Sequence, residues 1–153
     1  ITGLKAAFDP QFLDSPSDLQ GLDEDARMAI YAVAFKGHYS FGGAQMDLLP
    51  NLKLIAKYGV GYDAVDIPAA NLRGVKVTNT PDVLNDDVAD IAVGMMLMQT
   101  REMSQAALWA RSGDWKTGGE YRLNRKFTGS KVGIVGLGRI GREIANRLAA
   151  FKI

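Results

Sequence analysis

The chain has 153 residues, 47% of them hydrophobic, and its 18 basic and 17 acidic residues leave a formal net charge of +1. This length suits one ordinary domain, or one domain and part of another. No basic stripe and no apolar stretch of about 18 residues occurs, which argues against a nucleic-acid partner and a membrane span. Cysteine is absent, which rules out disulfides and thiolate metal ligands and agrees with a cytoplasmic location.

The first half of the chain alternates between helical and strand patterns. A short helix is expected before Pro10, followed by polar, irregular residues 11–27. Apolar runs then predict strands at 29–35, 52–58 and 75–79, with helices at 42–50 and 66–74 between them. This alternation is typical of βαβ units and predicts a parallel sheet with helices on both faces. Ligands of such sheets bind beyond the carboxyl ends of the strands, so the loops that follow the strands are the expected places for a site.

One of these loops, KYGVGYD at 57–63, has two glycines around Val60. Successive N–H groups of such a loop can turn to one side and form a small nest for a carboxylate, although a plain strand-to-loop turn explains the same residues. His38, the single histidine, also lies in a loop after a strand. We expect it to serve at the surface or in loop packing rather than in catalysis.

Residues 85–111 read as one long helix with Asn85 as a cap candidate and two acidic residues after it. Its apolar face extends almost all round, which predicts burial between domains or between subunits. Its four methionines favour packing over metal binding. Asp86 and Asp87 are adjacent, so they do not share a helix face and are interpreted as helix-start charges. No spacing suggests a metal site, and the polar, glycine-rich residues 112–130 are expected to form an extended arm.

The stretch KVGIVGLGRIGREIANRLAAF at 131–151 combines a short apolar strand, 132–135, with a glycine turn and a helix. Gly136, Gly138 and Gly141 form G-x-G-x-x-G. The first glycine permits the turn, the second lets the backbone approach a pyrophosphate, and the third allows close packing of helix and strand. The phosphates would lie at the helix N-terminus. A glycine turn kept only for packing is the alternative. The acidic residue that would separate NAD from NADP is expected about 20 residues further on, beyond Ile153.

Several stretches together resemble the NAD(P)-dependent D-2-hydroxyacid dehydrogenases, in particular the glyoxylate/hydroxypyruvate reductase type. They are YGVGYDAVDIPAANLRGVKVTNTPDVLNDDVADIAVGMML, then RSGDW, then GSKVGIVGLGRIGREIANRL. The resemblance implies an α/β protein with an incomplete flavodoxin-like substrate domain over 1–84. Residues 85–153 would begin a Rossmann NAD(P)-binding domain with its first strand, turn and helix, and the helix 85–111 would lie between the domains and help form a homodimer.

The resemblance also implies site residues. The backbone of Val60 and Gly61 would hold the carboxylate of a small 2-keto or 2-hydroxy acid. The cofactor, NAD or NADP, would be bound by Asn85, which stands where the family often has threonine, and by the turn residues Gly136, Leu137, Gly138, Arg139, Ile140 and Gly141. The family's catalytic arginine, glutamate and histidine come from further along the Rossmann domain. This chain therefore has no catalytic residue of its own by that match, and His38 matches none of the three.

Three readings follow. The parent protein is an oxidoreductase that transfers a hydride between NAD(P)H and a small 2-keto acid. Alternatively, it is a nucleotide-sensing, corepressor-like protein on the same scaffold, or this chain is a fragment without catalytic function. The chain is expected to be cut at both ends and inactive alone, with residues 132–135 lacking the neighbouring strands that they need.

Overall fold

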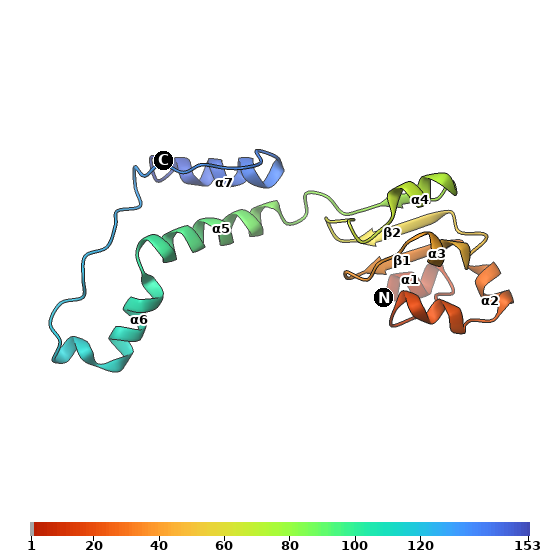
Figure 1. The fold of residues 1–153 in the computed structure, drawn as a ribbon, viewed down its shortest axis with the longest axis horizontal. Helices are drawn as coiled ribbons and strands as arrows, with labels where there is room; N and C mark the ends of the chain where they lie inside the picture. Colours follow the sequence, from red (N-terminus) through yellow and green to blue (C-terminus); the bar gives the residue numbers. More distant parts are fainter. Residues whose placement is uncertain (1) are drawn as a thin grey trace. The chain divides into compact units, whose positions relative to one another are not determined.

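The computed structural model describes residues 2–153, except the side chains of Thr2 and Leu4. The chain divides into two compact units, with the division between Pro81 and Asp82 (Figure 1). The sequence had placed this boundary after residue 84. No helix of the described residues combines the length and apolar character needed to cross a membrane.

Unit 1, up to Pro81, contains a small parallel sheet and short helices. Its elements are α1 (Thr2–Ala7), η1 (Pro16–Gly21), α2 (Glu24–Ala29), β1 (Ala32–Lys36), α3 (Gly43–Asp47), β2 (Leu54–Tyr58), α4 (Ile67–Leu72) and β3 (Lys76–Thr78). Residues 11–27, expected to be irregular, include η1 and the start of α2. The acidic residues at the start of α2 could have predicted it. The carboxylate of Asp23 caps the helix by accepting a hydrogen bond from the N–H of Ala26 at 2.8 Å.

The sheet has the strand order β1-β2-β3, and both pairs are parallel. Register aligns Val33 with Ile55 and Ile55 with Val77, so these side chains share one face. This face carries the core of unit 1, against which α3 and α4 pack and contact each other. The other face leaves Ala32 and Ala34 exposed. Helices on both faces were expected, but among the described residues they cover one face.

Unit 2, from Asp82 onward, is helical. It contains α5 (Asn85–Thr100), α6 (Met103–Ser112), η2 (Asp114–Lys116) and α7 (Arg139–Ala149). The expected single helix 85–111 is two helices, because the chain breaks at Arg101 and Glu102, and Glu102 adopts a left-handed φ of 48°. Residues 132–135 form no strand. As expected, no strand of the described residues lies beside them, and a ladder needs a partner.

The core of unit 2 lies between α5 and α7, which run side by side (Figure 1). Val93, Phe127 and Leu148 are its buried members, and Val132 packs against them. The guanidinium of Arg147 joins the two helices by ion pairs to Asp86 and Asp90 on α5 and to Glu143 on α7. Hydrogen bonds donated to these carboxylates raise the pKa of Arg147 above its usual range.

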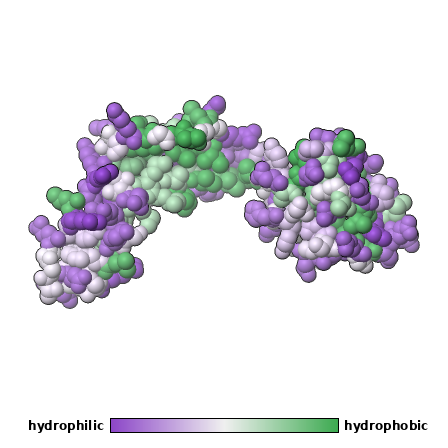
Figure 2. Space-filling model, viewed as in Figure 1, coloured by the Kyte–Doolittle hydropathy of each residue, from purple (hydrophilic) through white to green (hydrophobic). Residues whose placement is uncertain are grey.

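A second apolar stripe of α5 faces away from this core. Val88, Ile91, Met95 and Met98 recur at helical spacing, and Ile91 and Met95 are each about two thirds exposed, at 66% and 65%. Figure 2 shows hydrophobic residues along the part of the surface that α5 occupies. The sequence predicted that this helix is buried almost all round. In the structure one side is buried, where Met96 and Leu97 pack against the core, and the other side is exposed.

Candidate functional site

A cavity of about 350 Å³ lies at the carboxyl ends of β1 and β2. It is lined by the last residues of these strands and the residues that follow them, 36–38 and 57–61, with Asp63 and Ala64. This is the place where parallel α/β sheets bind ligands. Val60 and Gly61, the residues predicted to hold a substrate carboxylate, both line the cavity. Its volume is at the small end of ligand pockets, which suits a small molecule.

The loop from Gly59 to Gly61 is held in place by hydrogen bonds to the loop that follows β3. The N–H of Gly59 donates to Oγ1 of Thr80 at 3.1 Å, and the N–H of Thr80 donates to the carbonyl of Gly59 at 3.0 Å. The side-chain amide of Asn79 donates to the carbonyl of Val60 at 2.9 Å. Neither Asn79 nor Thr80 was identified from the sequence. The available signal was their position, because both follow a strand whose carboxyl end adjoins that of β2.

This anchoring leaves two backbone donors unused. Across residues 2–153, the N–H groups of Val60 and Gly61 have no hydrogen-bond acceptor. Both groups belong to a loop that lines the cavity. A carboxylate accepts hydrogen bonds from adjacent N–H groups of this kind. These free N–H groups are compatible with the carboxylate nest that the sequence suggested and with a plain turn, since Gly61 is exposed to solvent.

Three basic residues, Lys36, His38 and Lys57, also line the cavity. His38 is exposed, in agreement with the expected surface position, and lines the edge of the cavity. Lys57 comes from β2 and is only 6% exposed. Its ammonium donates to the carbonyl of Gly37 at 2.8 Å and lies 5.0 Å from the centre of the Phe35 ring. Lys57 was not selected from the sequence, because a lysine in a strand pattern is usually solvent-exposed.

The glycine turn in unit 2 has the backbone that its pattern predicts. Gly136 has a left-handed φ of 93°. A Cβ at Gly141 would lie 2.3 Å from the carbonyl oxygen of Gly136, so only glycine lets the helix approach this closely. Gly138 has nothing within 4 Å of its hypothetical Cβ and stands at the N-cap of α7 without a side-chain cap. The first N–H groups of α7 are therefore open to an anion, as a nucleotide pyrophosphate would require.

Asp82 connects two of the predicted cofactor residues. Its carboxylate accepts a hydrogen bond from Nδ2 of Asn85 at 2.9 Å and pairs with Nε of Arg139 at 3.1 Å. The structure thus brings Asn85, at the start of α5, together with the turn. Of the other turn residues, Leu137 is 60% exposed and Ile140 is half-buried. Asp82 was missed because its partner Arg139 lies far along the chain.

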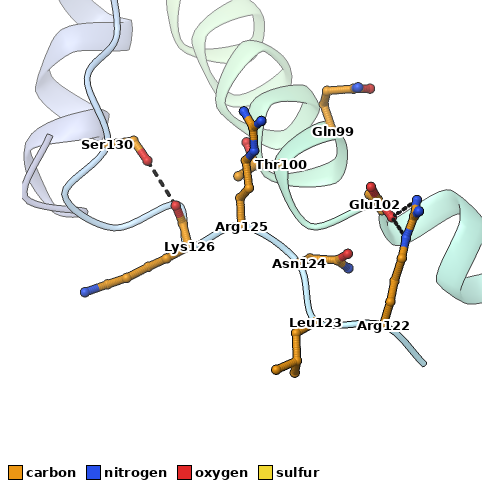
Figure 3. A pocket seen from close by; sticks show the side chains of 9 residues that line it. All are labelled: Gln99, Thr100, Glu102, Arg122, Leu123, Asn124, Arg125, Lys126 and Ser130. Atoms are coloured by element: carbon orange, nitrogen blue, oxygen red, sulfur yellow. Dashed lines mark hydrogen bonds and ion pairs between the residues drawn. The ribbon is translucent and has the colours of Figure 1, made fainter. Parts of the chain in front are cut away.

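A larger cavity in unit 2, of about 580 Å³, has a different lining (Figure 3). It lies between the end of α5 and the arm from Arg122 to Ser130, and the guanidinium of Arg122 donates to the carboxylate of Glu102 at 2.7 Å. None of the predicted site residues line it. Its lining is mostly polar, so the carboxyl-end cavity and the glycine turn remain the candidate sites.

A parallel sheet with a cavity at its carboxyl end, followed along the chain by a glycine turn at a helix N-terminus, is the arrangement of α/β enzymes that use nucleotides. The sequence from 8 to 151 matches the family described as D-isomer specific 2-hydroxyacid dehydrogenase, catalytic domain. The chain belongs to this family, as the sequence resemblance had indicated.

Similar proteins agree with this assignment. A glyoxylate/hydroxypyruvate reductase A of Arabidopsis thaliana is 43% identical over 128 residues, which are 84% of this chain and 41% of that protein. A 2-hydroxyacid dehydrogenase from Ketogulonicigenium vulgare has a solved structure with 45% identity and a TM-score of 0.86, covering 99% of this chain and 48% of that one.

The NADPH-dependent glyoxylate/hydroxypyruvate reductase of Sinorhizobium meliloti, solved in complex with NADP and malonate, has 40% identity and a TM-score of 0.83. The match covers 98% of this chain and 46% of that one. The chain thus spans between about a third and two fifths of the length of curated relatives that it matches, for example 32% of one and 41% of another.

Proposed function

We propose that the full-length protein carrying this chain reduces small 2-keto acids, such as glyoxylate and hydroxypyruvate, with NADH or NADPH. The observation that carries this proposal is the pair of unused N–H groups at Val60 and Gly61 in a small cavity at the carboxyl end of the sheet. A 2-keto acid has a carboxylate that these groups can bind. The names of the relatives, which are glyoxylate and hydroxypyruvate reductases, support the same substrate class.

The glycine turn supplies the nucleotide part of the proposal. The residues fit a dinucleotide because Gly138 leaves open space and α7 begins without a side-chain cap. In this proposal the pyrophosphate is bound by the backbone of the turn residues, and Asn85 and Arg139, held by Asp82, lie beside it. The bound nicotinamide nucleotide supplies the hydride. The S. meliloti relative, solved with NADP, supports this choice of cofactor.

Within this proposal, residues 1–153 bind and orient the substrate and the nucleotide, and the acid–base chemistry comes from elsewhere in the protein. The family resemblance assigns the catalytic histidine and arginine to the Rossmann domain beyond α7. His38 is near the substrate cavity but follows β1 in unit 1. It is therefore not assigned the role of the proton donor to the substrate oxygen.

The test uses the full-length protein, glyoxylate and hydroxypyruvate, and the loss of reduced-nicotinamide absorbance with NADH or NADPH. Gly138→Ala adds a methyl group where the pyrophosphate would approach. Because charged hydrogen bonds are lost or lengthened, the KM for the nucleotide should rise roughly tenfold or more. Gly133→Ala is the matched control, since nothing lies within 4 Å of either hypothetical Cβ. An absence of turnover with both nucleotides, or equal KM values in the two variants, would contradict the proposal.

We also propose that the protein is a homodimer that buries the exposed stripe of α5. Four apolar side chains in one line along a helix, two of them two thirds exposed, are unusual on a monomer surface. A two-fold axis brings the same stripe of both copies together. Met95→Asp should convert a dimer to a monomer in analytical ultracentrifugation, whereas Met28→Asp, at an exposed position of α2, should not. A wild-type monomer at micromolar concentration would refute this part.

A further inference from the structure

We propose that Lys57 determines the charge of the substrate by binding its carboxylate together with the N–H groups of Val60 and Gly61. This inference rests on the proposed function and adds to it a specificity-determining side chain. Lys57 is the one charged residue among the buried residues of the described chain, at 6% exposure. A buried ammonium is costly unless it is compensated, which makes its presence beside a cavity a feature to be explained.

The ammonium is only partly satisfied within the protein. It has three hydrogen-bond donors. One is used by the carbonyl of Gly37 at 2.8 Å, and no other acceptor or carboxylate of residues 2–153 bonds or pairs with it. Asp63 lines the same cavity but forms no ion pair with Lys57. The Phe35 ring, 5.0 Å away, stabilises a cation without neutralising it.

The free donors lie beside the proposed nest. A Cβ built on Gly59 would be 3.4 Å from Nζ of Lys57, so the ammonium adjoins the start of the loop whose next two N–H groups have no acceptor. All these groups line one cavity. A carboxylate placed there would bring the missing negative charge to the lysine and form charge-assisted hydrogen bonds. The site therefore selects an anion over a neutral analogue of the same shape.

A purely structural role makes a different prediction. If Lys57 only ties β2 to the loop of Gly37, its replacement should weaken acidic and neutral ligands equally, through the position of the loop. If it binds the carboxylate, its replacement should weaken acids alone. Lys57→Met removes the charge and the donors but keeps a long apolar stem, and Lys57→Gln removes the charge but keeps a donor for the Gly37 carbonyl. Lys53→Met, at an exposed position just before β2, is the matched control.

The experiment measures kcat and KM for glyoxylate and for its neutral methyl ester in the full-length protein, and titrates malonate by calorimetry. Both Lys57 variants should raise the KM for glyoxylate roughly ten- to hundredfold, with kcat and the nucleotide KM changed only a few-fold. The ester should be nearly unaffected, and malonate should bind more weakly by a similar factor. Lys53→Met should behave as wild type.

Equal losses for acid and ester, or unchanged malonate binding in both variants, would overturn the inference, as would a wild-type protein that binds no malonate. Failure of the proposed function is distinguishable from this outcome. A protein that shows no turnover but binds malonate in a manner that depends on Lys57 would contradict the reductase proposal and leave the anion site supported. Thermal melting of each variant shows whether it is folded. If Lys57→Met does not fold, Lys57→Gln alone tests whether Lys57 binds the carboxylate.

Discussion

Replacement of Gly141 by alanine tests whether the third glycine of the turn is required for packing. Its Cβ would lie 2.3 Å from the carbonyl oxygen of Gly136 and 3.5 Å from Cγ2 of Ile134. Favourable separations between non-bonded atoms are about 3.5–4.0 Å, so helix or turn must move by roughly 1 Å. The obstacle is a backbone carbonyl in a turn with left-handed φ, which cannot rotate away as a flexible side chain could.

The expected cost follows from two opposing effects. Overpacking of this kind costs about 1–3 kcal/mol. Alanine is favoured over glycine inside a helix by about 1 kcal/mol, which offsets part of that cost. Gly94→Ala in α5 has the same propensity gain, and its new methyl group would have nothing within 4 Å. A difference of about 1–3 kcal/mol in unfolding free energy between the two variants therefore isolates the steric term.

The assay is urea unfolding of the full-length protein followed by circular dichroism, with a fluorescence titration of NADPH on the folded variants. Gly141→Ala should unfold at a lower urea concentration than Gly94→Ala and bind the nucleotide more weakly, because the start of α7 has moved. Equal midpoints in the two variants would refute the steric reasoning. A lower midpoint with unchanged nucleotide affinity would confirm the packing role and contradict pyrophosphate binding at this turn.

Three further predictions concern stability. Leu148→Ala, at 3% exposure, should cost about 2–5 kcal/mol in urea unfolding, whereas Leu72→Ala, at 87% exposure, should change stability by no more than about 0.5 kcal/mol. Arg147→Met should lower the urea midpoint at low ionic strength, by an amount that decreases as salt screens its ion pairs, and a salt-independent loss would contradict the electrostatic account. Hydrogen bonds from Arg73 lower the pKa of Asp47 below 3.8. The pair therefore stabilises the fold above that pH and less as the pH falls through the lowered value, so wild type should exceed Asp47→Asn in stability near neutral pH, with a gap that closes on acidification.

The sequence predicted most of the elements that depend on local pattern. The strands at β1, β2 and β3 and the helices α3, α4 and α7 all lie within or near their expected ranges. Each has an apolar run of the right period with a clear stop, such as Gly74 after α4, whose φ of 65° favours glycine. The helix α5 was expected as well, but its end at Arg101 was not, because no glycine or proline marks the break.

The features that were missed depend on contacts between distant residues. The anchoring of the Gly59 loop joins residues about twenty positions apart. Oγ1 of Thr80 accepts a hydrogen bond from the N–H of Gly59, at a separation of 21, and Nδ2 of Asn79 donates to the carbonyl of Val60, at a separation of 19. Local periodicity carries no information on such pairs.

The same reasoning explains why glycines were conspicuous in the sequence and Lys57 was not. In both proposed sites the groups that would bind an anion are backbone N–H groups, which every residue except proline possesses. What a sequence can display is therefore the residue type that permits the backbone geometry, as at Gly136 and Gly141. Backbone donors recognise any carboxylate or phosphate of suitable size, so they provide affinity without much discrimination. Discrimination needs a side chain placed at the same point, and in the cavity at the carboxyl ends of β1 and β2 the fold brings Lys57 there from a strand position at which the sequence alone predicts exposure to solvent.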